Sequence, residues 1–171
     1  MLGFIAARDL RVMRRCNNWM APRWIRLWMI CATRGGDGWL WYAVLLGVLL
    51  FGGTERFHAA GASAASAAIG IWVFLVLKKA ANRPRPCAIA PHAWATLLPP
   101  DQFSFPSGHT MTAFAVATPL LYYYPDLSLG LLFCAVSVAV SRILLGMHFL
   151  SDVVAGAVLG AVLGCVAVAA I

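Results

Sequence analysis

The sequence predicts an all-α membrane protein, a polytopic helical bundle with five transmembrane helices and an interfacial amphipathic helix before them. Of the 171 residues, 62% are hydrophobic and only 11% are charged, a composition far from that of soluble domains. Four apolar runs, at residues 59–77, 109–124, 127–145 and 149–171, each approach the roughly 20 residues that cross a bilayer. We therefore expect one domain, with a transmembrane core at 38–171.

The N-terminal region, residues 1–37, is strongly basic. Tryptophans at positions 19, 24 and 28 stand among its arginines, a mixture that favours a helix lying beside anionic lipid headgroups over a nucleic-acid surface. Pro22 suits a first helical turn, so residues 22–33 are expected to form a short amphipathic helix. The seven arginines of this region are Arg8, Arg11, Arg14, Arg15, Arg23, Arg26 and Arg34.

A shorter apolar run at residues 39–53 supplies the fifth span. The glycine-rich stretch before it ends the preceding helix, and Asp37 is a plausible N-cap for the new one. The next span, 59–77, follows a short turn containing His58, which we interpret as an interfacial residue. Its small residues at positions 61–64 predict close packing against a neighbouring helix.

The only long polar loop is predicted at residues 78–108. It contains six prolines that exclude a regular helix, at positions 84, 86, 91, 99, 100 and 106. It also contains the four cations Lys78, Lys79, Arg83 and Arg85. Long irregular loops in compact domains are usually functional or disordered. The five cysteines show no C-x-x-C spacing, so we expect free thiols and no metal site.

Two histidines stand at one predicted membrane face, because successive spans alternate in direction. His148 and Asp152 are four residues apart at the start of the last helix, so the carboxylate can accept one imidazole N–H and leave the other nitrogen as a nucleophile. His109 follows Ser107 and Gly108 where the third span begins, and the N–H groups of a helix N-terminus bind phosphate oxygens.

Three cations converge on the same face: Lys78, Arg85 and Arg142. Positive side chains of this kind can stabilise the oxygen-rich transition state of phosphoryl transfer without a metal. For Lys79 and Arg83 the sequence leaves two interpretations open, a functional role and simple anchoring at the membrane interface. The pattern therefore predicts a phosphate site near one end of the bundle.

Three motifs occur in order: Lys78 with Arg85-Pro86, then Pro106-Ser107-Gly108-His109, then Ser141-Arg142 with His148 and Asp152. With them, the chain resembles the type 2 phosphatidic acid phosphatase family of membrane lipid phosphatases. The resemblance implies a six-helix fold, so residues 19–33 are the candidate for a sixth span. It also implies that His148 attacks phosphorus, Asp152 orients it and His109 protonates the leaving oxygen, with no cofactor.

The same resemblance assigns phosphate binding to Lys78, Arg85, Ser107, Gly108 and Arg142. The expected substrate is a lipid phosphate from the bilayer, with undecaprenyl pyrophosphate favoured over phosphatidylglycerol phosphate and phosphatidic acid. Two alternatives stay open, a vanadium-dependent haloperoxidase and a protein that only binds or moves anionic lipid. No nucleic acid and no obligatory protein partner are expected.

The orientation in the membrane is predicted differently by two observations. The N-terminal arginines favour a cytoplasmic N-terminus, and five spans then put the site in the cytoplasm too. The family resemblance implies a multi-pass protein of the bacterial inner membrane with its site at the periplasmic face, and we favour this second prediction.

Overall fold

The structure, a computed structural model, describes residues 2–89 and 102–171. Apart from an isolated bridge between Pro84 and Phe103, the regular elements within those ranges are helices, which confirms the all-α prediction. They are α1 (Leu2–Asn18), α2 (Arg23–Gly35), α3 (Trp39–Phe51), η1 (Gly53–Glu55), α4 (Arg56–Ala81), α5 (Pro86–Ile89), α6 (Gly108–Tyr123), η2 (Pro125–Leu127), α7 (Ser128–Leu144) and α8 (Leu150–Ala170).

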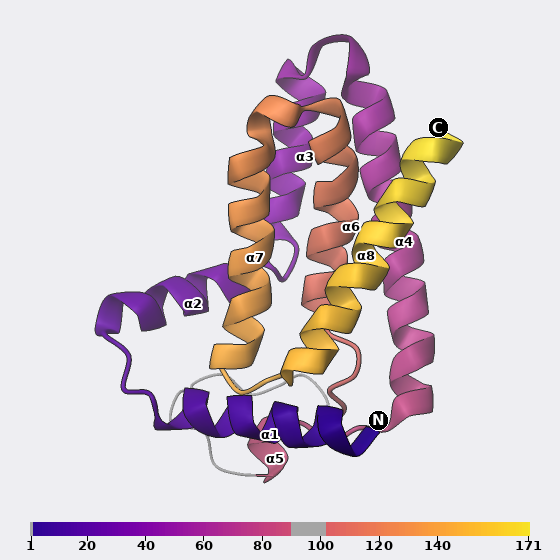
Figure 1. Cartoon of the computed structure of the whole chain (residues 1–171). Coiled ribbons are helices and arrows are strands. Elements are labelled where there is room, and N and C mark those ends of the chain that lie inside the picture. The colour runs from indigo at the N-terminus through magenta and orange to yellow at the C-terminus, as the bar shows by residue number, and fades with distance from the viewer. Residues whose placement is uncertain (1, 90–101) are drawn as a thin grey trace.

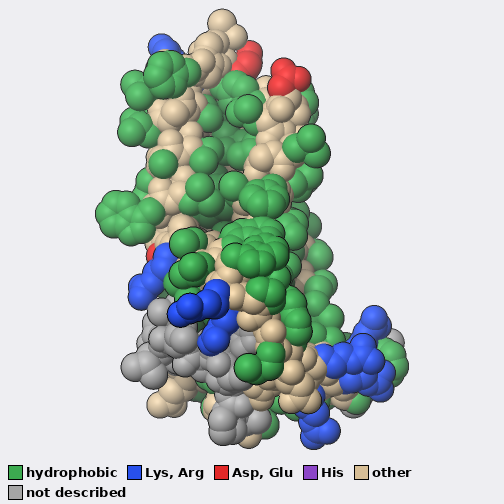
Figure 2. All heavy atoms as spheres, turned by 90° about the vertical axis from the view of Figure 1, so that its left-hand side faces the viewer, with side chains coloured by type: hydrophobic (Ala, Val, Ile, Leu, Met, Phe, Trp, Pro, Cys, Tyr) green, Lys and Arg blue, Asp and Glu red, His purple; other side chains and the backbone are tan. Residues whose placement is uncertain are grey.

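Helices α3, α4, α6, α7 and α8 form an upright bundle, and they coincide with the five predicted apolar runs (Figure 1). In the described part of the chain, three helical stretches are long and apolar enough to cross a membrane: Gly53–Ala81, Pro125–Leu144 and Leu150–Ala170. Trp39–Phe51 is a shorter apolar helix. Hydrophobic side chains cover the bundle face shown in Figure 2, whereas Lys and Arg gather towards its lower end. These features indicate an integral membrane protein.

Helix α6 occupies the centre of the bundle, where it packs against α4, α7 and α8. Small residues allow the close approach. In α4, the hydroxyl of Ser66 donates to the backbone oxygen of Ala115 at 2.8 Å, and Ser63 donates to that of Val116 at 3.2 Å. Ala62 and Ser63 are fully buried, so the predicted close packing of residues 61–64 holds for these two positions.

Helix α8 approaches α6 through glycines spaced four residues apart, Gly156, Gly160 and Gly164. A Cβ atom built on Gly160 would lie 2.2 Å from the backbone oxygen of Met111. Because residues four apart share one face of a helix, the three glycines form a flat contact surface. The backbones of α6 and α8 thereby come together over most of their lengths.

In the N-terminal region, α2 confirms the helix predicted at residues 22–33, and residues 2–18 form a further helix that was not predicted. Figure 1 shows both helices lying across the bundle, with α1 running beneath its lower end and α2 leaving from the side of α7. The side chain of Trp28 on α2 stacks on Phe133 of α7 at 5.5 Å between ring centroids. Helix α2 thus packs against α7 but runs across the direction of the five bundle helices instead of parallel to them (Figure 1).

The polar loop begins later than predicted. Helix α4 continues through Lys78 and Lys79 and ends at Asn82, whose φ of 46° is the left-handed conformation common at helix C-termini. Both lysines thus belong to the last helical turn instead of the loop. The predicted prolines at positions 91, 99 and 100 lie outside the described residues.

Candidate active site

His148 lies in the short turn between α7 and α8, with 3% of its surface exposed. Its Nδ1 atom is 2.6 Å from the backbone oxygen of Ser104. A carbonyl oxygen only accepts, so Nδ1 carries the proton and Nε2 is the unprotonated nitrogen, 3.3 Å from Nη1 of Arg85. Burial lowers the pKa of the imidazole to about 4, and Arg142 and Arg85 act in the same direction against Asp152. The ring is therefore neutral near pH 7.

Asp152 is fully buried in the first turn of α8, but its contacts differ from the predicted pairing. Its Oδ2 atom is 3.8 Å from Nδ1 of His148, beyond hydrogen-bond distance. Oδ2 instead accepts the N–H of Phe149 at 2.8 Å, and Oδ1 pairs with Nη1 of Arg83 at 2.6 Å. The helical spacing of four residues brings the two side chains close, but the Nδ1 proton of His148 is donated to the backbone carbonyl of Ser104 instead of to Asp152.

A cavity of about 320 Å³ lies beside His148 and holds most of the predicted site residues. Among its lining residues are all three predicted phosphate-binding cations, both histidines and Gly108. The full lining is Gly36, Asp37, Gly38, Tyr42, Ile71, Phe74, Lys78, Arg85, Gly108, His109, Thr112, Arg142 and His148. Five segments of the chain that are far apart in sequence therefore meet at one cavity.

The three cations of the cavity are held in place by neutral neighbours, among other contacts. Arg85 donates from Nη1 to the backbone oxygen of Met147 at 2.8 Å, and Arg142 donates to the hydroxyl of Thr33 at 2.5 Å. The Nζ atom of Lys78 lies 4.6 Å from the ring centroid of Phe74. Both arginines are 3% exposed, so water screens their charge only weakly and the cavity attracts anions.

The N-terminus of α6 faces the same cavity through Gly108 and His109. Ser107 is the N-cap residue, and the first helical bond runs from the N–H of Met111 to its backbone oxygen. Its own hydroxyl, fully buried, is 3.0 Å from that of Thr110, and its N–H donates to the backbone oxygen of Asp152. In this structure Ser107 thus joins α6 to α8 and does not line the cavity.

The prediction that Asp37 caps α3 is wrong, because Gly38 is the N-cap and Asp37 points to His109. The Oδ1 atom of Asp37 lies 2.6 Å from Nε2 of His109. Gly38 has a φ of 124°, which a residue with a side chain rarely adopts, and a Cβ atom on Gly36 would lie 3.2 Å from the His109 ring. The two glycines therefore let this turn approach α6.

Sequence reasoning missed two residues that contact the site, Thr33 and Ser104, and favoured a helix-capping role for Asp37 over a catalytic one. For Arg83 the sequence left open whether it is a functional residue or a membrane anchor. In the structure its Nη1 atom lies 2.6 Å from Oδ1 of Asp152. The proline-rich loop could have suggested that a nearby basic residue was folded inward. Ser104 contacts His148 through its backbone oxygen, and a pattern of side chains cannot predict such a contact.

Within residues 2–89 and 102–171, no group of three or more His, Cys, Asp or Glu side chains is placed to hold a metal ion. The five cysteines are free thiols, as predicted, and they lie apart from the cavity lining.

Comparison with known proteins gives a consistent result. The sequence profile of the PAP2 superfamily matches residues 59–171, which include every predicted site residue. The chain is 35% identical over 130 residues to decaprenylphosphoryl-5-phosphoribose phosphatase of Mycobacterium tuberculosis, an alignment that covers 75% of this chain and 69% of that protein. It is 27% identical over 147 residues to lipid A 1-phosphatase of Rhizobium johnstonii, covering 74% of this chain but only 59% of that protein.

A solved structure extends the similarity to the N-terminal helices. The crystal structure of Aquifex aeolicus LpxE superposes with a TM-score of 0.79 at 26% sequence identity, and the match covers 94% of both chains. The arrangement of these helices is therefore one that a solved protein of nearly the same length adopts.

Proposed function

Because the chain belongs to the PAP2 superfamily, we propose that it is a membrane lipid phosphatase that hydrolyses a phosphomonoester or pyrophosphate through a phosphohistidine on His148. One observation supports this above the others. The unprotonated Nε2 of His148 and the ring of His109 border one cavity that three cations line. A protein that only bound or moved anionic lipid would need the cations but neither histidine.

In the proposed first step, Nε2 of His148 attacks phosphorus, and the bond between phosphorus and the lipid oxygen breaks. His109 gives its proton to that leaving oxygen, while the three cations balance the charge on the phosphoryl oxygens. His148 becomes positively charged, with its Nδ1 proton held by Ser104. The buried carboxylate of Asp152, 3.8 Å away, stabilises that charge without sharing the proton.

In the second step, water attacks phosphorus from the side that the lipid left, and His109 takes its proton. The bond between phosphorus and Nε2 breaks, which restores neutral His148 and releases phosphate. Asp37, 2.6 Å from His109, is placed to hold that ring in one orientation through both proton transfers. All the charge stabilisation in this cycle comes from side chains and helix N–H groups, so we propose that the reaction needs no metal.

For the substrate we favour undecaprenyl pyrophosphate, with phosphatidylglycerol phosphate and phosphatidic acid as alternatives. A cavity of about 320 Å³ suits a phosphate headgroup and leaves the lipid tail outside. Tyr42 and Ile71, which line the cavity, are 68% and 49% exposed on the bundle, so the tail can lie along the lipid-facing surface between α3 and α4. The relative from Mycobacterium tuberculosis acts on a decaprenyl lipid, which supports a polyprenyl substrate.

We propose five spans in a bacterial inner membrane, with the site at the outer face. In Figure 1 the C-terminus lies at the end of the bundle away from α1 and α5. Green fluorescent protein fused to the C-terminus should then be fluorescent, since it folds in the cytoplasm. A dark fusion, together with activity of alkaline phosphatase at the same position, would put the site in the cytoplasm, as the arginines of the N-terminal region predict.

The decisive experiment measures phosphate release by the purified protein from these lipids and from lipid A 1-phosphate, with and without excess EDTA. We expect one lipid to give the highest kcat/KM, no loss on chelation, and a loss of about 10³-fold or more in His148→Ala. Binding of the lipids without any phosphate release would favour the transport alternative. Activity that EDTA abolishes and magnesium restores would exclude the metal-independent reaction.

A further inference from the structure

A chain of charged side chains, two buried carboxylates joined by the partly buried Arg83, connects α1 to Asp152. One nitrogen of the Arg83 guanidinium, Nη2, lies 2.7 Å from Oδ2 of Asp9, and the other, Nη1, lies 2.6 Å from Oδ1 of Asp152. Asp9 is 3% exposed and Asp152 is fully buried. One planar cation therefore bridges two carboxylates that come from the first and the last helix of the chain.

Asp9 also binds the first turn of α8. Its Oδ1 accepts the N–H of Ser151 at 3.0 Å, and its Oδ2 accepts the Ser151 hydroxyl at 2.5 Å. The first N–H groups of a helix have no partner within the helix, and a carboxylate there is favoured by the helix dipole. Asp9 thus acts as a cap supplied by another helix, directly beside Asp152.

The geometry of Arg83 depends on Asp9. A guanidinium is rigid and planar, so fixing Nη2 on one carboxylate fixes the direction of Nη1. The Arg83 plane also lies over the ring of Phe149, 4.2 Å from the centroid, which limits its freedom further. Without Asp9, Arg83 would keep its Nη1 contacts with Asp152 and with the Ser151 hydroxyl at 2.7 Å, but Nη2 would lose its carboxylate and the guanidinium could shift. The cation that balances the charge of Asp152 would then be held less firmly.

We propose that Asp9 is a positioning residue of the reaction, which acts through Arg83 on Asp152. The inference rests on the proposed function, in which Asp152 stabilises positive charge on His148. It goes beyond that function because Asp9 lies outside residues 59–171, the part that the family profile matches. Helix α1 is then part of the catalytic apparatus and not only a membrane anchor.

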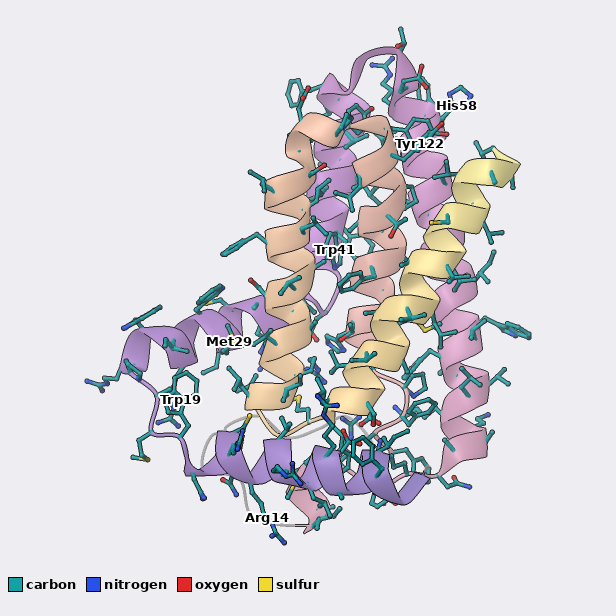
Figure 3. The ribbon with its side chains drawn as sticks, viewed as in Figure 1. Arg14, Trp19, Met29, Trp41, His58 and Tyr122 are labelled. Atoms are coloured by element: carbon teal, nitrogen blue, oxygen red, sulfur yellow. The ribbon has the colours of Figure 1, made fainter. Side chains whose placement is uncertain are left out.

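The alternative is that Asp9 merely fastens α1 to the bundle, and a double-mutant cycle separates the two. The variants are Asp9→Asn, Arg83→Gln and the double variant, with Arg14→Gln as the control. Arg14 is exposed on the same helix and points away from the bundle (Figure 3). Each is assayed for kcat, KM and the midpoint of thermal unfolding in the same detergent.

We expect Asp9→Asn to lower kcat about 10-fold to 100-fold, with KM within threefold of the wild type, because a small displacement of a catalytic group costs this much. The double variant should be no slower than the slower single variant, since both remove the same contact. The control should match the wild type. A kcat within twofold of the wild type, additive losses in the double variant, or losses that follow unfolding would each overturn the proposal.

The failure of the proposed function would be visible separately. If the wild type releases no phosphate, the function fails, and the labelling rate of His148 by diethyl pyrocarbonate, read by mass spectrometry, tests the positioning alone. Asp9→Asn should then change that rate severalfold relative to the wild type and Arg14→Gln. An unchanged rate would show that Asp9 has no influence on the His148 environment.

Discussion

The contact between α6 and α8 should not tolerate a single added methyl group at Gly160. A Cβ atom there would lie 2.2 Å from the backbone oxygen of Met111 and 3.0 Å from the backbone nitrogen of Ala115. Backbone atoms cannot rotate away as a side chain can. Because non-bonded contacts need roughly 3.2 Å or more, Gly160→Ala must separate the two helices by about 1 Å.

The separation should affect both stability and rate. Overpacking of this kind costs about 1–3 kcal/mol, of which the better helix propensity of Ala returns at most about 1 kcal/mol. The same helices carry His109 and Asp152 at their N-terminal turns. A shift of about 1 Å between catalytic groups costs on the order of 10²-fold, so kcat should fall by about that factor.

The assay compares kcat and the unfolding midpoint of Gly160→Ala with those of the wild type in one detergent. Gly130→Ala is the matched control, because a Cβ atom on Gly130 in α7 meets nothing within 4 Å. That control should retain full activity and at least the stability of the wild type. If Gly160→Ala is as stable and as fast as the control, the helices are not held at the distance described.

Three other predictions concern the site itself. Asp152→Asn should lower kcat by on the order of 10³-fold with little change in the vanadate Ki. Arg142→Ala should lower kcat and also weaken vanadate binding. Equal losses of vanadate affinity in the two variants would mean that Asp152 shapes the phosphate pocket. The lowered pKa of His148, about 4 against an ordinary value near 6.5, means that the folded state resists protonation of this ring, so stability is full above pH 6.5 and falls as the pH drops. Relative to His148→Asn, the wild type should lose about 3 kcal/mol of unfolding free energy between pH 7 and pH 4, and parallel pH profiles of the two would contradict the burial of a neutral ring. Asp37→Asn should lower kcat about 10-fold to 100-fold while the lipid KM stays within threefold, and an unchanged kcat would show that His109 needs no orienting partner.

The five bundle helices could be predicted from their apolar runs, although α4 continues past the end of its run through Lys78 and Lys79. The predicted run 109–124 became Gly108–Tyr123, with a serine N-cap at one end and Pro125 beyond the other. Local chemistry of this kind is visible in sequence. The predicted helix at residues 22–33 is confirmed by α2, whereas α1 was not predicted, because nothing in residues 1–22 signals a helix held by one buried aspartate.

The pairings within the site were harder to predict. Asp37 and His109 are 72 residues apart, and Asp9 and Arg83 are 74 apart. Motif spacing placed the groups at one end of the bundle, but it could not say which carboxylate would meet which cation. His148 and Asp152 illustrate the limit, because their helical spacing predicted a direct bond and a backbone carbonyl replaced it.

The cavity lies towards the end of the bundle that carries α1 and α5, whereas His58 and Tyr122 mark the opposite end (Figure 3). Under the proposed function, only lipids whose headgroups lie in one leaflet reach the histidines. Each turnover then removes a charged headgroup from that leaflet alone and releases phosphate into a single compartment. A lipid made in the other leaflet must first be flipped, and hydrolysis then prevents its return in the same form. The enzyme would therefore couple the free energy of phosphate hydrolysis to a difference in lipid composition between the two leaflets.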